Sequence, residues 1–134
     1  MKSICETTYF PKVALDYLAR ATRIVEEIPI AFEPVIGEEL RCHEVARVVG
    51  TILELKVLDG AYAAVDHSWC MIEGPGHRGK KLILDSYSVG RLPQVQLVDF
   101  YVNPLYRPKE SRTDIRESVV SDLLFYLSKC GIRG

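Results

Sequence analysis

Three residues suited to thiol catalysis follow one another along the chain: Cys42, His67 and Asp85. A thiolate nucleophile needs a nearby imidazole to accept its proton, and the imidazole needs an acceptor that fixes its tautomer and orientation. Each of the three residues lies in a context that suits one part of this chemistry. The set therefore predicts a chemistry more clearly than it predicts a substrate.

Cys42 lies at the start of an apolar helical pattern, in the segment ELRCHEVARVVGTIL. Backbone N–H groups and the positive end of the helix dipole favour a thiolate at such a position. Arg41 and His43 add slightly to this effect, whereas three nearby glutamates oppose it. The alternative is that Cys42 is a small buried apolar residue, as most free cysteines are.

His67 lies in a strand-like segment, AYAAVDHSWCMI, and Asp85 lies in the next one, KLILDSY. If the two strands form a hairpin with Ile72 opposite Lys80, His67 lies directly across from Asp85. Opposed residues are close enough for an Nδ1–H to carboxylate hydrogen bond, and a slip by one residue would place Asp85 on the other face. Cys70 is expected to face away from His67. The alternative for His67 is a hydrogen-bonded core residue.

The segments LRCHEVARVV, AVDHSWCMIE and LILDSYS resemble the papain-like and transglutaminase-like cysteine hydrolases. In that superfamily a cysteine at a helix N-terminus packs against a sheet that carries histidine and then aspartate or asparagine, in that order. The resemblance covers residues 38–90 and implies a papain-like or transglutaminase-like core. It also implies that Cys42 is the nucleophile, His67 the general base and acid, and Asp85 the orienting group.

The predicted activity is that of a thiol hydrolase or acyltransferase acting on an amide, isopeptide or thioester bond. Its substrate would be a protein, a peptide or a small amide, and no cofactor or metal is expected. Trp69 could line the substrate site, although it suits a core position equally well. The alternative function is a non-catalytic binding or partner-inhibiting protein on the same scaffold. Only 25 residues separate Cys42 from His67, and no glutamine precedes Cys42 closely as an oxyanion donor; both features favour the alternative.

A metal-binding regulatory module is a third alternative, because zinc-type ligands occur near one another in the sequence: Cys42, His43, His67 and Cys70. Their spacing does not match the close ligand pairs of structural zinc sites.

The composition excludes several classes of function. Seventeen basic and eighteen acidic residues among 134 leave a net charge of −1, which argues against nucleic-acid binding. We find no apolar run of about 18 residues and no apolar segment after the N-terminal lysine, so no membrane span or export signal is predicted. Four cysteines without a CxxC pair are typical of reduced thiols in a cytoplasmic protein. The basic residues Lys109, Arg112 and Arg116 are expected on a solvated face, with an acidic partner as the alternative. The oligomeric state is not predicted.

The elements follow from hydrophobic periodicity and turn residues. A first helix opens at Pro11, with a face formed by Val13, Ala14, Tyr17, Leu18, Ala21 and Val25. A second helix of about fifteen residues follows Gly37, with a possible break at Gly50 and Thr51 before a strand at 53–57. Strands are predicted at 61–72, 81–87 and 95–102, with a hairpin loop at 73–79. A last helix spans 113–129, capped by Ser111 or Thr113 and ended by Gly131. The pattern predicts a single α+β domain over residues 1–134, with helices packed on an antiparallel sheet.

Overall fold

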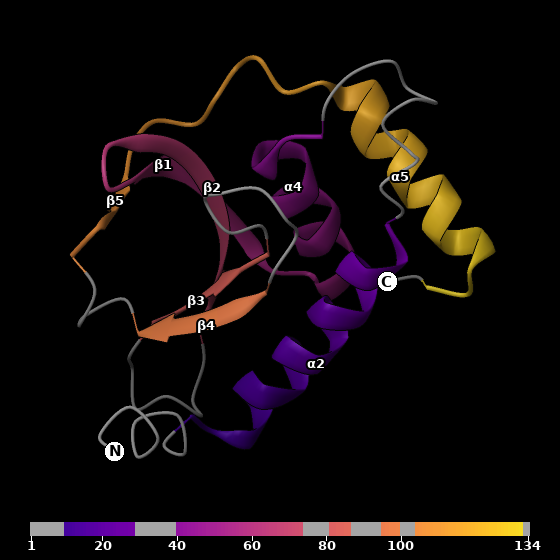
Figure 1. Cartoon of the computed structure of the whole chain (residues 1–134), viewed down its shortest axis with the longest axis horizontal. Helices are drawn as coiled ribbons and strands as arrows, with labels where there is room; N and C mark the ends of the chain where they lie inside the picture. Colours follow the sequence, from indigo (N-terminus) through magenta and orange to yellow (C-terminus); the bar gives the residue numbers. More distant parts are fainter. Residues whose placement is uncertain (1–9, 29–39, 74–80, 87–94, 100–103, 133–134) are drawn as a thin grey trace.

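The chain forms helices packed against one curled antiparallel sheet (Figure 1). The structure, a computed structural model, describes residues 10–28, 40–73, 81–86, 95–99 and 104–132. In chain order the elements are α2 (Lys12–Glu27), α4 (Cys42–Leu53), β1 (Lys56–Tyr62), β2 (Val65–Ile72), β3 (Leu82–Asp85), β4 (Gln96–Asp99), β5 (Tyr106–Pro108) and α5 (Glu117–Lys129). The strands pair antiparallel in the order β4-β3-β2-β1-β5. The predicted α+β class with an antiparallel sheet is confirmed.

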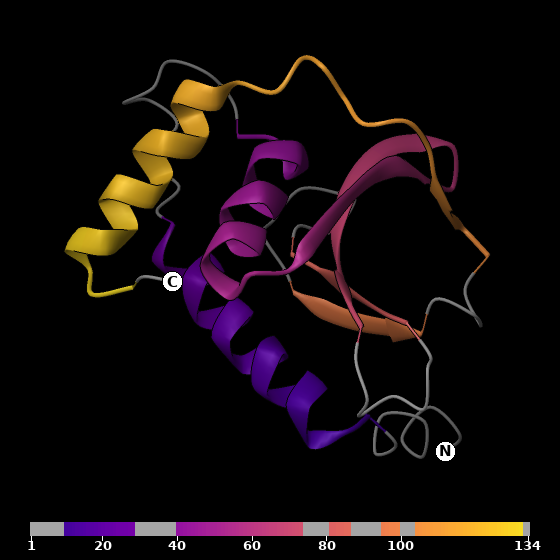
Figure 2. The same cartoon turned by 180° about the vertical axis from the view of Figure 1, so that it is seen from behind.

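The helices lie on one side of the sheet, with α4 between the sheet and α5 (Figures 1 and 2). Because side chains alternate along a strand, β2 and β3 each contribute to two clusters of buried residues. Cys70, Ile72, Leu82 and Leu84 belong to the main core with the helices. Trp69, Met71 and Ile83 form a second cluster with Tyr106. His67 and Asp85 have the strand parity of this second cluster and lie in it, away from α4's apolar face.

The curl of the sheet is shown by a contact between strands that are not neighbours. Tyr106 on β5 donates its hydroxyl to Asp85 on β3, at 2.6 Å, although β1 and β2 lie between these strands in the sheet. In a flat sheet, three strand spacings would separate them by about 14 Å. Gly60 on β1 permits the curl, because a Cβ there would lie 2.1 Å from the Arg107 carbonyl oxygen of β5.

Helix α4 is shorter at its start and longer at its end than predicted. It begins at Cys42 and spans 12 residues. The sequence left open a break at Gly50 and Thr51, but the helix continues through both residues and ends where Glu54 adopts the left-handed conformation. Glycine is the residue that fits at position 50 because α4 packs closely against β1 there: a Cβ at this position would lie 2.5 Å from Val57 Cγ2.

The first helix follows its predicted pattern apart from its outermost residue. Pro11 is the residue before α2, and Ala14, Ala21 and Val25 are buried as predicted. Val13 was predicted on the same face but is exposed. Of the described helices, none has the length and apolar character needed to cross a bilayer.

Helix α5 begins later than predicted. Its first residue is Glu117 rather than Thr113, and neither Ser111 nor Thr113 caps it. Gly131 ends the helix as expected, with φ of +88° and the Ile132 N–H bonded to the Leu127 carbonyl.

The strands differ from the prediction in three places. The strand predicted at 53–57 begins only at Lys56, as β1, because Leu53 still belongs to α4. Residues 61–72 were expected to be one extended segment, but Ala63 and Ala64 form a turn with φ of 50° and 72° between β1 and β2. This turn has no glycine, asparagine or proline to mark it in the sequence. Strand β5 was not predicted. The predicted loop at 73–79 lies, apart from Glu73, outside the described residues, as do the ends of the strands predicted at 81–87 and 95–102.

Candidate active site

Cys42 is the first residue of α4, as the sequence predicted. The preceding residue, Arg41, is extended with φ of −115° and ψ of 152°, so the chain enters the helix sharply at the cysteine. The first N–H groups of an α-helix have no partner within the helix. The half-buried Cys42 thiol therefore lies at the positive end of α4.

His67 and Asp85 form a buried hydrogen-bonded pair. His67 Nε2 lies 2.9 Å from Asp85 Oδ1 and 2.8 Å from Oδ2, and both side chains are almost completely buried. The prediction that the two residues are neighbours on adjacent antiparallel strands with their side chains on one face is confirmed. Because Nε2 is bonded to Asp85, Nδ1 is the ring nitrogen left to serve Cys42.

Two details of the predicted pair are wrong. The observed register places Cys70 opposite Leu84 and Ile72 opposite Leu82, which differs by two residues from the predicted pairing of Ile72 with Lys80. His67 and Asp85 are therefore diagonal rather than directly opposed. A shift of two residues preserves the face of every side chain, so the contact survives. In addition, the His67 atom that contacts the carboxylate is Nε2 rather than the expected Nδ1.

Tyr106 adds a donor to this pair that the sequence did not reveal. Its hydroxyl lies 2.6 Å from Asp85 Oδ2, and its ring packs edge-on against Trp69 with centroids 5.1 Å apart. Burial and the neighbouring Asp85 carboxylate raise the pKa of Tyr106, so the phenol remains a hydrogen-bond donor. The sequence held little signal, because Tyr106 belongs to a strand of three residues.

The electrostatics of Cys42 and His67 favour an ion pair. Burial raises the pKa of the Cys42 thiol, but hydrogen bonding to His43 and His67 outweighs it and lowers the pKa to about 6. Burial lowers the pKa of His67, but hydrogen bonding to Asp85 and to Cys42 raises it to about 9. Between these values the cysteine is a thiolate and the histidine an imidazolium, which is the state that attacks a carbonyl.

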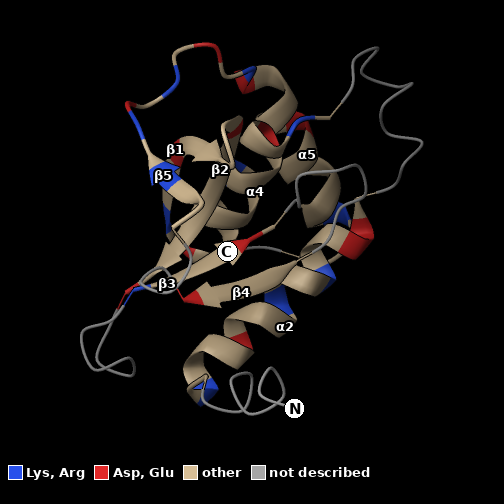
Figure 3. Cartoon of the chain, turned by 60° about the vertical axis from the view of Figure 1, so that its left-hand side comes forward, with Lys and Arg blue, Asp and Glu red and all other residues tan. Residues whose placement is uncertain are grey.

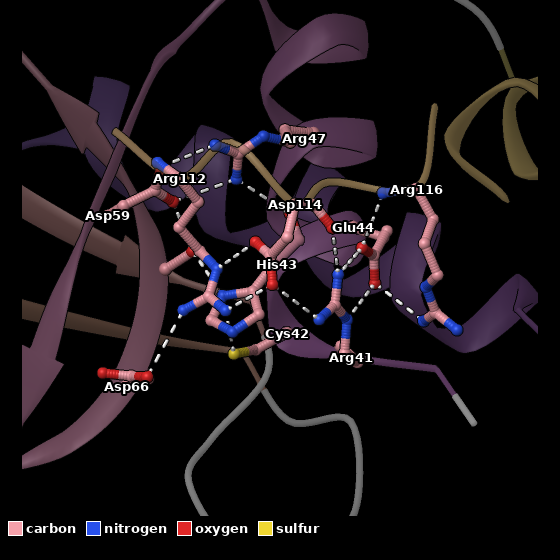
Figure 4. Close-up of polar contacts among 11 residues, drawn as sticks. Arg41, Cys42, His43, Glu44, Arg47, Asp59, Asp66, Arg112, Asp114 and Arg116 are labelled. Atoms are coloured by element: carbon pink, nitrogen blue, oxygen red, sulfur yellow. Dashed lines mark hydrogen bonds and ion pairs between the residues drawn. The ribbon is translucent and has the colours of Figure 1, made fainter. Parts of the chain in front are cut away.

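A second polar chain reaches Cys42 from the opposite face of the sheet (Figure 4). His43 Nδ1 lies 3.6 Å from Cys42 Sγ and 2.7 Å from Ser68 Oγ, and Ser68 donates to Asp59. Asp59 also forms an ion pair with Arg47. The sequence indicated His43 only as a minor influence on Cys42 and as a zinc-type ligand, because its hydrogen-bond partner Ser68 lies 25 residues away.

Cys70 and Trp69 are completely buried. Cys70 faces away from His67, as predicted: its Sγ lies 3.4 Å from the Ala46 carbonyl oxygen, and burial raises its pKa to about 12. Trp69 packs in the second cluster, which matches its alternative as a core residue, and its Nε1 finds no hydrogen-bond partner among the residues that the structure describes. Contact between Trp69 and a substrate stays a prediction.

The basic residues near α5 are paired with acidic residues rather than gathered as a cationic surface. Charges of both signs follow the segment between β5 and α5 (Figure 3). Arg112 pairs with Asp66 and Asp114, and Arg116 pairs with Glu44. The same segment, residues 109–114, lines an open surface hollow of about 580 Å³. Asp114 also contacts Arg41, so this hollow lies next to the N-terminus of α4.

Among the residues that the structure describes, Cys42, Cys70 and Cys130 are free thiols. Within the same residues, no cluster of three or more histidine, cysteine, aspartate or glutamate side chains has an arrangement that could hold a metal ion. Cys5 lies outside the described part of the chain.

Comparison with known proteins adds no relative. No protein-family model, no curated protein and no solved structure matches this chain. What the chain offers toward a function is therefore its own geometry: a cysteine at a helix start, joined to a buried histidine and aspartate on the adjoining sheet.

Proposed function

We propose that the protein is a thiol hydrolase or acyltransferase with a papain-like or transglutaminase-like arrangement of Cys42, His67 and Asp85. The observations that carry the proposal are the buried hydrogen bonds between His67 and Asp85 and the position of Cys42 at the start of α4, where His67 helps to lower the pKa of the thiol. The order of the three residues in the sequence and their placement, with cysteine on a helix start and the other two on strands, agree with the resemblance in the sequence. The bond attacked is an amide, isopeptide or thioester of a protein, a peptide or a small amide.

In this mechanism the Cys42 thiolate attacks the carbonyl carbon, and a C–S bond forms as the carbonyl π electrons move to oxygen. The Cys42 N–H, without a partner inside α4, is a suitable donor for that oxygen. When the C–N or C–S bond to the leaving group breaks, the protonated His67 gives its Nδ1 proton to the departing amine or thiolate. Water or an acceptor amine then attacks the acyl-enzyme while His67 takes its proton, and the thiolate is restored.

Asp85 and Tyr106 support these proton transfers without touching the substrate. The Asp85 carboxylate accepts the His67 Nε2–H, which directs Nδ1 toward Cys42, and its charge stabilises the imidazolium. The Tyr106 hydroxyl occupies a position on the same carboxylate and fixes its orientation. The whole second cluster then holds His67 in one rotamer.

The proposal is tested by acyl transfer followed by mass spectrometry. Wild-type protein is incubated with a panel of peptide thioesters and activated amides, and the adduct is located by peptide mapping. An acyl group on Cys42 that is discharged by water or by an added amine, with repeated turnover, is expected. Cys42→Ala is the inactive control, and Cys130→Ala is the matched control because Cys130 is a free, half-buried thiol at the end of α5 rather than at the start of α4.

The same experiment can contradict the proposal. Absence of turnover, together with alkylation of Cys42 no faster than that of Cys130, would overturn it. That result would favour the alternative, a non-catalytic binding or partner-inhibiting protein on this scaffold.

A further inference from the structure

A second imidazole lies beside the Cys42 sulfur, and the mechanism above gives it no part. His43 follows Cys42 on α4 and is buried, and its Nδ1 contacts both the Cys42 sulfur at 3.6 Å and the Ser68 hydroxyl at 2.7 Å. Ser68 pairs with Asp59 across the β1–β2 hairpin. His67 and Ser68 are consecutive residues of β2 and face opposite sides of the sheet, so the two histidines belong to separate polar chains.

The hydrogen bonds at Asp59 determine which atom of His43 carries a hydrogen. The Asp59 carboxylate accepts four donors: two from Arg47, one from the Ser68 hydroxyl and one from the Arg112 backbone N–H. An ionised carboxylate has about four acceptor positions, so all of them are occupied. The only hydroxyl hydrogen of Ser68 is therefore given to Asp59. Its oxygen can then only accept from His43, and Nδ1 of His43 must carry a hydrogen.

This direction excludes Nδ1 of His43 as the base for Cys42. The nitrogen that contacts the sulfur already bears a hydrogen and offers an N–H rather than a lone pair. Nε2 lies on another edge of the same ring and points away from Nδ1's contacts. By contrast, Nδ1 of His67 remains available because its Nε2 is bonded to Asp85.

We propose that His43 is a positioning residue: its Nδ1–H, oriented by Ser68 and Asp59, is shared between the Ser68 oxygen and the Cys42 sulfur and helps to hold the thiolate, while His67 alone moves protons. This inference rests on the proposed function. An N–H donor at a thiolate acts like the donors of an anion site, since it stabilises negative charge without exchanging a proton. It also restricts the sulfur to the side of α4 that faces His67.

The electrostatics agree with this geometry. Burial raises the pKa of Cys42, while hydrogen bonding to His43 and then to His67 lowers it. The titratable groups that face the sulfur are His43 from α4 and His67 from β2, with Asp59 and Asp85 behind them. Arg41 and Glu44, which flank these residues on the chain, are paired with each other.

The test compares His43→Leu with His43→Asn. Asparagine places an amide N–H near the position of Nδ1, whereas leucine fills similar space without a donor. The measured quantity is the midpoint pH of Cys42 alkylation by iodoacetamide, located by mass spectrometry. We expect His43→Leu to raise this midpoint by about one pH unit, the amount that a charge-assisted hydrogen bond contributes, and His43→Asn to keep it near the wild-type value.

Ser68→Ala provides a second variant if leucine at position 43 prevents folding. It leaves the imidazole in place but removes the oxygen that shares its Nδ1–H with the sulfur, so the hydrogen bond to the thiolate strengthens and we expect the midpoint to fall. An unchanged midpoint in His43→Leu, or in Ser68→Ala where His43→Leu does not fold, overturns the inference. A lowered melting temperature with an unchanged midpoint also overturns it, since a purely structural residue would behave in this way.

The readout needs no turnover, so the two proposals can fail separately. If only His67→Leu raises the Cys42 midpoint, the role of His43 is wrong and the proposed hydrolase remains. If His43→Leu raises the midpoint but wild-type protein transfers no acyl group, the positioning role stands and the hydrolase is wrong. An ordinary thiol midpoint in wild-type protein would overturn both.

Discussion

At the scale of single residues, Cys42 lies where two polar chains from opposite faces of one strand meet. His67 and Ser68 are consecutive on β2, and each has a carboxylate behind it: Asp85 for the first and Asp59 for the second. The alternation of a β-strand usually separates the functions of its two faces. Here the start of α4 packs against the sheet, so that polar chains from both faces of β2 reach Cys42.

Cys42→Ala is expected to abolish acyl transfer with little change in melting temperature, because the sulfur forms the bond and nothing replaces it. Asp85→Asn is expected to leave reduced activity. The amide oxygen can still accept the Nε2–H of His67, but the charge that stabilises the imidazolium is gone. The comparable change in a Ser-His-Asp enzyme costs about 10⁴-fold, and a smaller loss is expected here because the ion pair forms before substrate binds. Turnover and thermal unfolding of the three proteins check this, and activity in Cys42→Ala would end the nucleophile assignment.

The pH dependence of kcat/KM should be bell-shaped. Activity rises as the thiol of pKa about 6 ionises and falls as the imidazolium of pKa about 9 loses its proton. The two midpoints belong to the coupled pair rather than to either residue. A single rising limb with its midpoint near about 8.5, the value of a free cysteine, would show that no ion pair forms. Rates measured between pH 5 and pH 10 with one thioester substrate distinguish the two profiles.

The residues of the candidate site differ in how far the sequence could reveal them. Cys42, His67 and Asp85 were found because residue type, order and strand parity are local properties, and parity survived an error of two residues in register. Tyr106 and the His43–Ser68–Asp59 chain were not found. Their contacts depend on how the sheet curls and on where α4 meets it, and no pattern in the sequence encodes either.

At the scale of elements, Glu44 joins the two helices that flank the site. It is completely buried near the start of α4 and accepts hydrogen bonds from Arg41 and from the Arg116 side chain and backbone N–H. Arg116 precedes the first residue of α5, so Glu44 ties the start of that helix to α4. The predicted caps Ser111 and Thr113 were wrong because α5 begins only at Glu117.

Glu44→Gln is expected to lower the free energy of unfolding by about 3 kcal/mol, the lower end for breaking a buried ion pair, because Arg41 and Arg116 keep some contact with water. Asp16→Asn is the matched control: the Lys12–Asp16 pair is exposed, and its loss should cost less than about 0.5 kcal/mol. Urea unfolding of both variants measures the difference. Equal stability of the two variants would show that Glu44 does not join the helices.

Element prediction succeeded where periodicity was long and failed where a tertiary contact decided the outcome. The helices α2 and α5 and the sheet class follow from repeated apolar positions. Gly50 looked like a helix break, yet the close approach of Val57 makes glycine the residue that packs there. The Ala63–Ala64 turn and β5 carry no turn residue or alternation from which they could have been predicted.

At the scale of the whole molecule, stability should decrease in acid. Burial raises the pKa values of Glu44 and Asp59, but their arginine partners lower both to about 2. Because the folded-state values lie below those of the unfolded chain, the unfolded chain binds protons first as the pH falls. The stabilisation is complete above about pH 5 and is lost toward pH 2, by about 3 kcal/mol for Glu44 and about 2 kcal/mol for Asp59.

Chemical unfolding at a series of pH values between 2 and 7 checks this expectation. Glu44→Gln should show a shallower decrease than wild-type protein, because it lacks one of the two titrating groups. If the free energy of unfolding falls as steeply with decreasing pH in Glu44→Gln as in wild-type protein, Glu44 is not one of the groups whose protonation destabilises the fold.

The sequence distances within the charge network also determine when the site can form. The Arg116 contact with Glu44 spans 72 residues, and the Arg112 contact with Asp59 spans 53. Contacts between such distant residues form late, because the entropy of closing the intervening loop is lost before they are gained. As a chain is synthesised from its N-terminus, α4 and the β1–β2 hairpin emerge before these counter-ions exist. Glu44 and Asp59 therefore gain these two partners only when the last segment docks, and in a partly made chain the polar chain behind His43 is not yet complete.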